Sequence, residues 1–159
     1  MKLLPYRKLT LITSLTKQEV YNSIANNTAP FPNGQMPFYG KINSSDFTIS
    51  RKIAGKNSFP LTIKGVIETD GNRRSVQLSF SPKPFIVIIA IVWLILAPFG
   101  AIMLLWKSAS AGTFNPSALI PVVFLIFGFV VFRHAFGAEF DTCKYTLKDI
   151  LEADEIIEN

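Results

Sequence analysis

The 159-residue sequence predicts an α+β membrane protein, in which an antiparallel sheet with a short N-terminal helix and a C-terminal helix is interrupted by a two-helix transmembrane hairpin. Three observations predict this arrangement. Polar and apolar residues alternate between positions 38 and 80, as they do in strands with one buried and one wet face. Two long uncharged apolar blocks follow, and a charged segment with apolar residues at helical spacing comes after them.

The first two elements are predicted to be a strand and a short helix. Residues 6–13 alternate as a strand does. Thr16 is a candidate helix N-cap, and Glu19, three positions later, completes a capping box. Val20 and Ile24 then predict the buried stripe of a short helix, which ends before a proline-rich loop.

Four further strands are predicted in two pairs. Residues 38–42 and 47–53 flank the turn sequence NSSD, and residues 59–68 and 75–80 flank a turn at Asp70-Gly71. In the second pair, apolar residues alternate with Thr, Lys, Ser and Gln. One face of this antiparallel sheet is therefore expected to pack against other elements, and the other face to meet solvent.

Residues 84–137 predict the transmembrane hairpin. The first span, about residues 85–106, contains 22 residues without a charge. At ~1.5 Å per residue it is about 33 Å long, enough for a hydrocarbon core of ~30 Å. The second span is predicted at about residues 113–136. Four residues of the spans are expected to kink a helix or to allow close helix packing: Pro98, Gly100, Pro121 and Gly128.

The charge distribution predicts the orientation of the hairpin. Residues 1–83 contain 12 Lys and Arg against 4 Asp and Glu, whereas the loop between the spans contains only Lys107. Because positive residues near spans stay in the cytoplasm, we expect a multi-pass protein of the cytoplasmic (inner) membrane with both termini cytoplasmic. Trp106, Arg133 and His134, at the ends of the spans, are predicted to be interfacial anchors.

Residues 138–159 predict a C-terminal helix that starts at Asp141 or Thr142 and packs back on the sheet. This segment contains 2 Lys against 7 Asp and Glu, which complements the basic residues 1–83. The two segments are expected to form one cytoplasmic domain, into which the hairpin 84–137 is inserted. The apolar stripe of the helix comprises Cys143, Leu147, Ile150, Leu151 and Ile157.

The sequence supplies few of the residues that an enzyme active site combines. His134 is the single histidine and Cys143 the single cysteine, whereas a structural zinc site uses four ligands of these kinds. The glycines are scattered without the spacing of a phosphate-binding loop. We therefore expect a protein that is not an enzyme and that has no cofactor or metal. Nucleic-acid binding is not expected either, because no basic face with interleaved aromatic residues is evident.

Basic residues of the predicted strands and turns are the candidate binding residues. If several share a surface that faces the bilayer, each contributes ~1 kcal/mol of attraction to anionic lipid. The alternative is that they provide ordinary solubility and the topology signal. The candidates are Lys41, Lys52, Lys56, Lys64, Arg73 and Arg74.

The motif FYGKI…F.I.RKI…NSF.L.I.G.I, in residues 38–67, resembles small uncharacterised bacterial two-span membrane proteins with a split β-rich cytoplasmic domain. The order of the elements is similar to that of helix-grip domains and of PH-like domains, in which a curved sheet is covered by a terminal helix. The helix-grip resemblance implies an apolar ligand between sheet and helix. Four central strands imply a smaller cavity than is usual in that family.

These observations predict a membrane-anchored, non-enzymatic binding or scaffolding module. It would recognise lipid, an apolar ligand or a protein partner at the cytoplasmic face of the membrane. The alternative is an oligomerising membrane subunit or a membrane-perturbing effector, whose spans associate with further copies.

Overall fold

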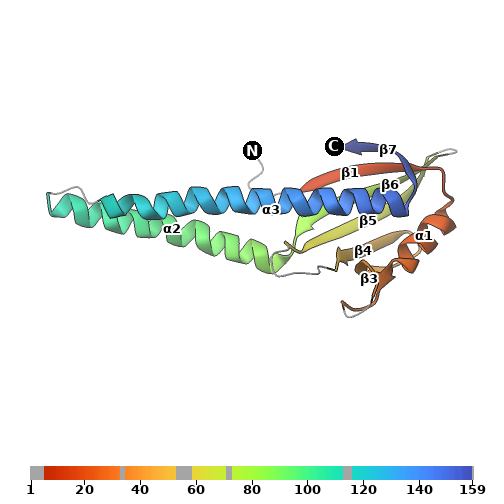
Figure 1. Cartoon of the computed structure of the whole chain (residues 1–159), viewed down its shortest axis with the longest axis horizontal. Coiled ribbons are helices and arrows are strands. Elements are labelled where there is room, and N and C mark those ends of the chain that lie inside the picture. Colours follow the sequence, from red (N-terminus) through yellow and green to blue (C-terminus); the bar gives the residue numbers. More distant parts are fainter. Residues whose placement is uncertain (1–5, 33–34, 53–58, 71–72, 113–115, 159) are drawn as a thin grey trace. The chain divides into compact units, whose positions relative to one another are not determined.

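The computed structural model describes residues 6–32, 35–52, 59–70, 73–112 and 116–158 (Figure 1). Within these residues the fold is α+β, with one seven-stranded sheet and three α-helices. The chain divides into two compact units. The first combines Met1–Lys83 with Phe136–Asn159, and the second is Pro84–Ala135.

The sheet of the first unit has the strand order β2-β3-β4-β5-β6-β1-β7. Neighbouring strands are antiparallel except β2 and β3, which are parallel. The first strand of the sequence therefore lies between β6 and the last strand. The strands are β1 (Arg7–Thr13), β2 (Thr28–Ala29), β3 (Phe38–Ile42), β4 (Asp46–Arg51), β5 (Leu61–Asp70), β6 (Arg73–Pro82) and β7 (Ala153–Glu158).

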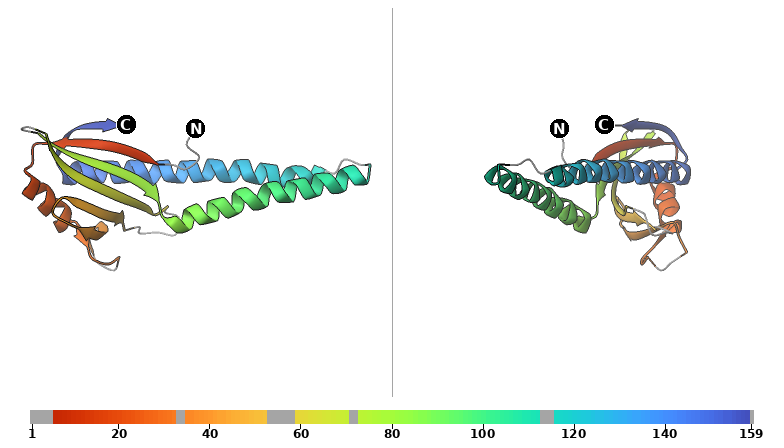
Figure 2. Two further views of the ribbon diagram at one scale, coloured as in Figure 1. Left: turned by 180° about the vertical axis from the view of Figure 1, so that it is seen from behind. Right: turned by 60° about the vertical axis from the view of Figure 1, so that its left-hand side comes forward.

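Side chains alternate between the two faces of the sheet along each strand, and those on the inner face form the core. One set of alternate residues is buried, as Ile49, Ile63 and Phe80 show in adjacent strands at exposures of 1% or less. Helix α1 (Lys17–Asn26) and the C-terminal part of α3 (Ile120–Ile150) cover this inner face, and α3 runs along the strands (Figures 1 and 2). Fully burying a Leu, Ile or Phe side chain contributes about 1.5–3 kcal/mol, so this layer dominates the stability of the unit.

Gly65 of β5 occupies the one inner-face position of its strand where Phe47 of β4 crosses over the backbone. A Cβ atom at Gly65 would lie 2.0 Å from the Phe47 ring. The glycine is therefore required by the aromatic ring of the neighbouring strand.

The predicted capping box of α1 is confirmed. The Glu19 amide donates to the Thr16 hydroxyl at 3.3 Å, and the Thr16 amide donates to the Glu19 carboxylate at 2.7 Å. Both hydrogen bonds satisfy amides that a helix N-terminus leaves without intrahelical partners. They also lower the pKa of the Glu19 carboxyl.

The predicted start of a separate C-terminal helix at Asp141 or Thr142 is wrong. Both residues lie inside α3, which continues without a break from the apolar block. The Thr142 hydroxyl donates to the carbonyl of Ala138 at 2.9 Å, a bond typical of a helix interior and not of an N-cap. No proline interrupts the helix between the apolar block and its end at Ile150.

The prediction that the helix extends to Ile157 is also wrong, because residues Ala153–Glu158 form β7. The chain reverses at Glu152, whose φ is 45°. The Thr13 hydroxyl of β1 donates to the carbonyl of Leu151 at 2.7 Å and so satisfies a backbone acceptor at the helix end. β7 then pairs with the free edge of β1, and Ile157 is 41% exposed.

The second unit contains α2 (Pro84–Ser110), the short 3-10 helix η1 (Pro116–Leu119) and the first part of α3. Both α-helices are long and apolar enough to cross a membrane. Trp93 of α2 packs on Gly128 of α3, where a Cβ atom would lie 1.9 Å from the indole ring. Gly128 therefore permits a close approach of the two helices.

The two prolines of these helices occupy different positions. Pro98 lies inside α2. Pro121 is the second residue of α3, in the first turn, where an amide has no intrahelical acceptor. Pro121 therefore removes no hydrogen bond from the interior of α3.

Candidate functional site

A group of aromatic side chains lies between the inner face of the sheet and α3. Phe80 of β6 meets Phe140 of α3 edge to face, with 4.9 Å between the ring centroids. Phe136, one turn before Phe140, stacks with it at 6.4 Å and also meets Phe59 at 6.4 Å. The helix-grip resemblance implied an apolar ligand between sheet and helix, and these rings lie in that layer. Each such pair contributes ~0.5–1.5 kcal/mol beyond its buried area.

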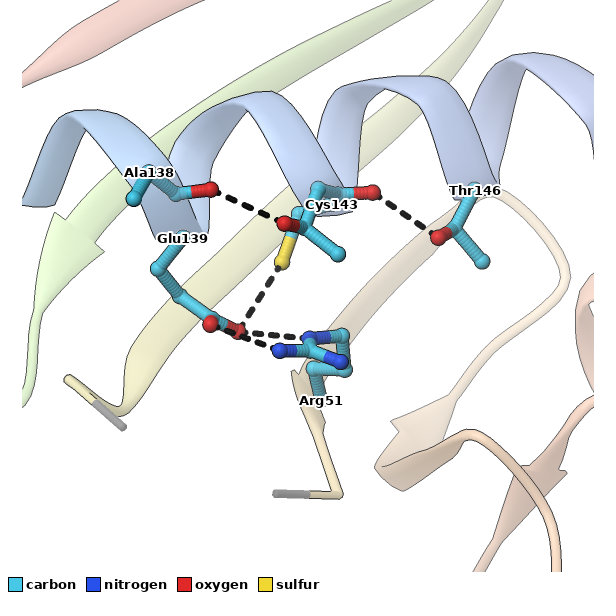
Figure 3. Close-up of polar contacts among 6 residues, drawn as sticks. Arg51, Ala138, Glu139, Cys143 and Thr146 are labelled. Carbon is cyan, nitrogen blue, oxygen red and sulfur yellow. Dashed lines mark hydrogen bonds and ion pairs between the residues drawn. The ribbon is translucent and has the colours of Figure 1, made fainter. Parts of the chain in front are cut away.

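One ion pair lies within this apolar layer and joins β4 to α3 (Figure 3). Arg51 donates through Nε to one oxygen of Glu139 at 2.6 Å and through Nη2 to the other at 2.7 Å. The Glu139 side chain is only 7% exposed. The thiol of Cys143, one turn further along α3, donates to the same carboxylate at 3.6 Å.

The electrostatics of this cluster make it structural. The hydrogen bond to Glu139 raises the pKa of Arg51, so the guanidinium stays charged. Burial, and secondly the negative charge of Glu139, raise the pKa of Cys143 to about 12. A neutral buried thiol is not a nucleophile, and a carboxylate held in a bidentate pair is not a free general base.

Sequence reasoning missed this pair, although a signal for it exists. Glu139 lies between Phe136 and Phe140, on the apolar stripe of α3. An acidic residue on such a stripe requires a buried cationic or hydrogen-bonding partner. The partner, Arg51, lies 88 positions earlier in the sequence, where nothing local identifies it.

The outer face of the sheet carries a row of lysines across five strands. Lys41 of β3 is opposite Thr48 of β4, and Thr48 is opposite Lys64 of β5. Lys64 is opposite Ser79 of β6, and Ser79 is opposite Lys8 of β1. These five residues, called the lysine row below, alternate cationic and hydroxyl side chains, and all three lysines are exposed.

Two carboxylates of the outer face, Asp46 beside the lysine row and Glu68 further from it, accept hydrogen bonds from side-chain amides. Asp46 is one pleat further along and accepts both hydrogen bonds of the Asn43 side-chain amide. Glu68 is two pleats beyond Lys64 on β5 and accepts a hydrogen bond from Gln77 at 2.6 Å. In the part of the chain that the structure describes, no carboxylate pairs with Lys41 or Lys64.

Of the six predicted binding residues, only Lys41 and Lys64 come together in this row, and the row adds Lys8, which sequence reasoning missed. Lys52 is exposed just after β4, and Lys56 lies outside the described residues. Arg73 begins β6. Arg74 is half-buried and opposite Thr13, a residue of the inner face at the other end of the strands.

The predicted interfacial anchors Trp106, Arg133 and His134 are all exposed, Trp106 at 76%.

A search of the described residues finds no group of three or more His, Cys, Asp or Glu side chains that could hold a metal ion. Comparison with protein-family models and with curated proteins finds no match to this chain. The fold and the surface therefore define its class: an α+β protein with a seven-stranded sheet and two helices long and apolar enough to span a membrane.

Proposed function

We propose that this protein is an integral protein of the cytoplasmic membrane whose sheet domain is a non-enzymatic binding or scaffolding module. One observation carries the proposal. Only 11% of the most apolar stretch of each long helix is buried within the structure. Ile95, Leu96 and Phe99, for example, are exposed at 61–62%. Apolar surface of this extent is stable in lipid and not in water.

The charge pattern supports an orientation with both ends of the chain in the cytoplasm. The segment before α2 carries 12 basic residues, whereas the far end of the hairpin carries only Lys107, in the last turn of α2. Since the two helices are joined by a short connection, both ends of the hairpin lie on one side of the membrane, and the positive-inside rule selects the cytoplasm.

The distribution of side chains supports binding at the outer face of the sheet. The inner face is occupied by the aromatic layer and by the Arg51–Glu139 pair. The outer face presents exposed lysines and hydroxyls, and no helix or strand among the described residues of the first unit covers them.

Single cysteines test the proposed topology. A cysteine at Ser110, at the end of α2, should be labelled by a membrane-impermeant maleimide in intact cells. A cysteine at Ser44, in the exposed β3–β4 turn, should be labelled only after the cells are opened. The wild-type chain is the matched control, because its single Cys143 is buried. Labelling of both positions from the same side would contradict the hairpin.

An oligomerising membrane subunit is the second candidate function, and one observation favours it. Apart from the backbone of α2 itself, no atom of the described residues lies within 4 Å of the position that a Cβ atom at Gly100 would take, so this face of α2 is open to another helix. Disulfide cross-linking of a Gly100→Cys variant in membranes tests it. A dimer would favour the subunit, and a monomer would favour the binding module.

A further inference from the structure

We propose that the lysine row binds the phosphate groups of anionic phospholipids at the surface of the membrane that holds the chain. This inference rests on the proposed membrane anchoring and deepens it by assigning the ligand class and the residues. The row consists of Lys8, Ser79, Lys64, Thr48 and Lys41 on adjacent strands of the outer face.

The spacing of the row suits a surface that carries many separate anions. Adjacent strands are ~4.8 Å apart, so neighbouring lysines, two strands apart, are separated by about 10 Å at their backbones. This is close to the Debye length at physiological salt, ~8 Å, so each ammonium group attracts its own anion and repels its neighbours weakly. A single small anion could not contact all three lysines.

The hydroxyl groups between the lysines add hydrogen-bond donors. The Tyr6 hydroxyl donates to Ser79 Oγ at 3.1 Å, which leaves the hydroxyl hydrogen of Ser79 for an outside acceptor. Thr48 is exposed between Lys41 and Lys64. Phosphate oxygens accept hydrogen bonds from ammonium and hydroxyl groups, and the row contains no carboxylate to compete with them.

The covalent chain keeps the row near the start of the first apolar helix. Ser79 precedes Pro84, the first residue of α2, by five residues. An extended chain spans at most about 3.5 Å per residue, so Ser79 lies within about 18 Å of that residue whatever the arrangement of the two units. The carboxylates Glu68 and Glu155 are at the opposite end of the outer face. Glu68 is opposite Ser75, Ser75 is opposite Ile12, and Ile12 is opposite Glu155.

An anionic leaflet is therefore the partner that this charge distribution fits. It is the anionic surface closest to the anchored row, and it attracts basic residues with ~1 kcal/mol each. An acidic protein or a nucleic acid could meet the same charges. The connection along the chain favours the leaflet, since β6 leads from Ser79 into the first apolar helix five residues later.

Lysine footprinting of the full chain tests the inference. The protein is reconstituted in nanodiscs of phosphatidylcholine alone or with one third phosphatidylglycerol, and acetylation of each amine is followed by mass spectrometry. We expect Lys8, Lys41 and Lys64 to react on the order of five-fold more slowly in the anionic discs, as ~1 kcal/mol per lysine implies. Lys17, exposed on α1, is the internal control and should react equally in both.

Three outcomes would overturn the inference. Equal reaction of the three lysines in both discs would do so, as would equal protection of Lys17. Protection by inorganic phosphate added to neutral discs would assign the row to a soluble anion. A chain that enters both kinds of disc but shows no protection refutes the lipid site and leaves the membrane anchor intact, whereas failure to enter either disc refutes the proposed function itself.

A variant with all three lysines changed to glutamine provides a second test. Because these side chains are exposed on the outer face, the triple variant should fold and enter the membrane as the wild type does. It should retain less phosphatidylglycerol in native mass spectrometry than a Lys17→Gln variant. Equal retention by the two variants would count against the row as the lipid site.

Discussion

Replacing Arg51 with methionine removes the cationic partner of a carboxylate that is almost fully buried. In the native structure Glu139 accepts two hydrogen bonds from Arg51, at 2.6 and 2.7 Å, and its side chain is 7% exposed. The methionine keeps most of the apolar volume of the arginine stem but cannot donate to the carboxylate. The variant therefore isolates the cost of an unpaired buried charge.

The magnitude follows from the burial of the two partners. Breaking a buried ion pair by removing one member typically costs 3–5 kcal/mol. Because the Arg51 side chain is 25% exposed, water can reach part of the pair, so we expect the lower end, about 3 kcal/mol. This corresponds to an increase of about a hundred-fold in the fraction of molecules whose sheet–helix layer is open.

Cys143 provides the assay within the chain. Its thiol is buried beside Glu139 and is the single cysteine of the protein, so it reacts with a maleimide when this layer opens. Labelling of Arg51→Met should be about a hundred-fold faster than labelling of the wild type. Each rate is divided by the rate measured for the same variant unfolded in urea, which removes differences in intrinsic thiol reactivity.

The double variant Arg51→Met/Glu139→Gln is the matched control. With the charge of Glu139 also removed, most of the cost should disappear, and labelling should return to within about ten-fold of the wild-type rate. The reasoning is refuted if the single variant labels within three-fold of the wild type. It is refuted equally if the double variant opens as often as the single one.

Three further predictions follow from the packing and from the pKa of the thiol. The pKa of Cys143 is raised to about 12 in the folded state, so its contribution to stability is complete below the unfolded pKa of ~8.5 and is lost as the pH rises towards 12. Between pH 9 and pH 11 the free energy of unfolding of the wild type, measured by urea unfolding and circular dichroism, should fall by about 1.4 kcal/mol per pH unit more than that of Cys143→Ala. The same dependence on pH in both proteins would contradict this. Gly65→Val should destabilise the sheet unit by about 1–3 kcal/mol in the same assay, because its Cβ atom would lie 2.0 Å from the Phe47 ring. An unchanged urea midpoint would show that the ring can move away. Gly128→Leu should lower the melting temperature of the detergent-solubilised protein by displacing Trp93, and an unchanged melting temperature would show that this helix contact contributes little.

Local patterns in the sequence predicted the elements that depend on neighbours along the chain. The uncharged block from residue 85 to residue 106 falls inside α2, and the capping box of Thr16 and Glu19 starts α1 as expected. The alternation of residues predicted five of the seven strands, and no predicted strand end differs from the observed one by more than two residues. The two strands that it missed are β2, which has two residues, and β7.

β7 shows why local reasoning failed at the end of the chain. Residues 138–150 are helical, and the acidic residues that follow continue a pattern compatible with a helix. The free edge of β1, more than 130 positions earlier, instead supplies backbone partners that turn these residues into a strand. Tertiary context overrides weak local propensity in such segments.

The sequence by itself determined the apolar helices, the alternation of the strands, the start of α1 and the excess of basic residues before residue 84, because each depends on residues a few positions apart. Only the tertiary structure decided that Lys8, Lys41 and Lys64 share one row and that Arg51 meets Glu139. Both depend on which strands are neighbours and on their register. Register is set by the pairing of segments far apart in sequence, and a shift of one residue in a strand would move its lysine, or Arg51 in β4, to the opposite face.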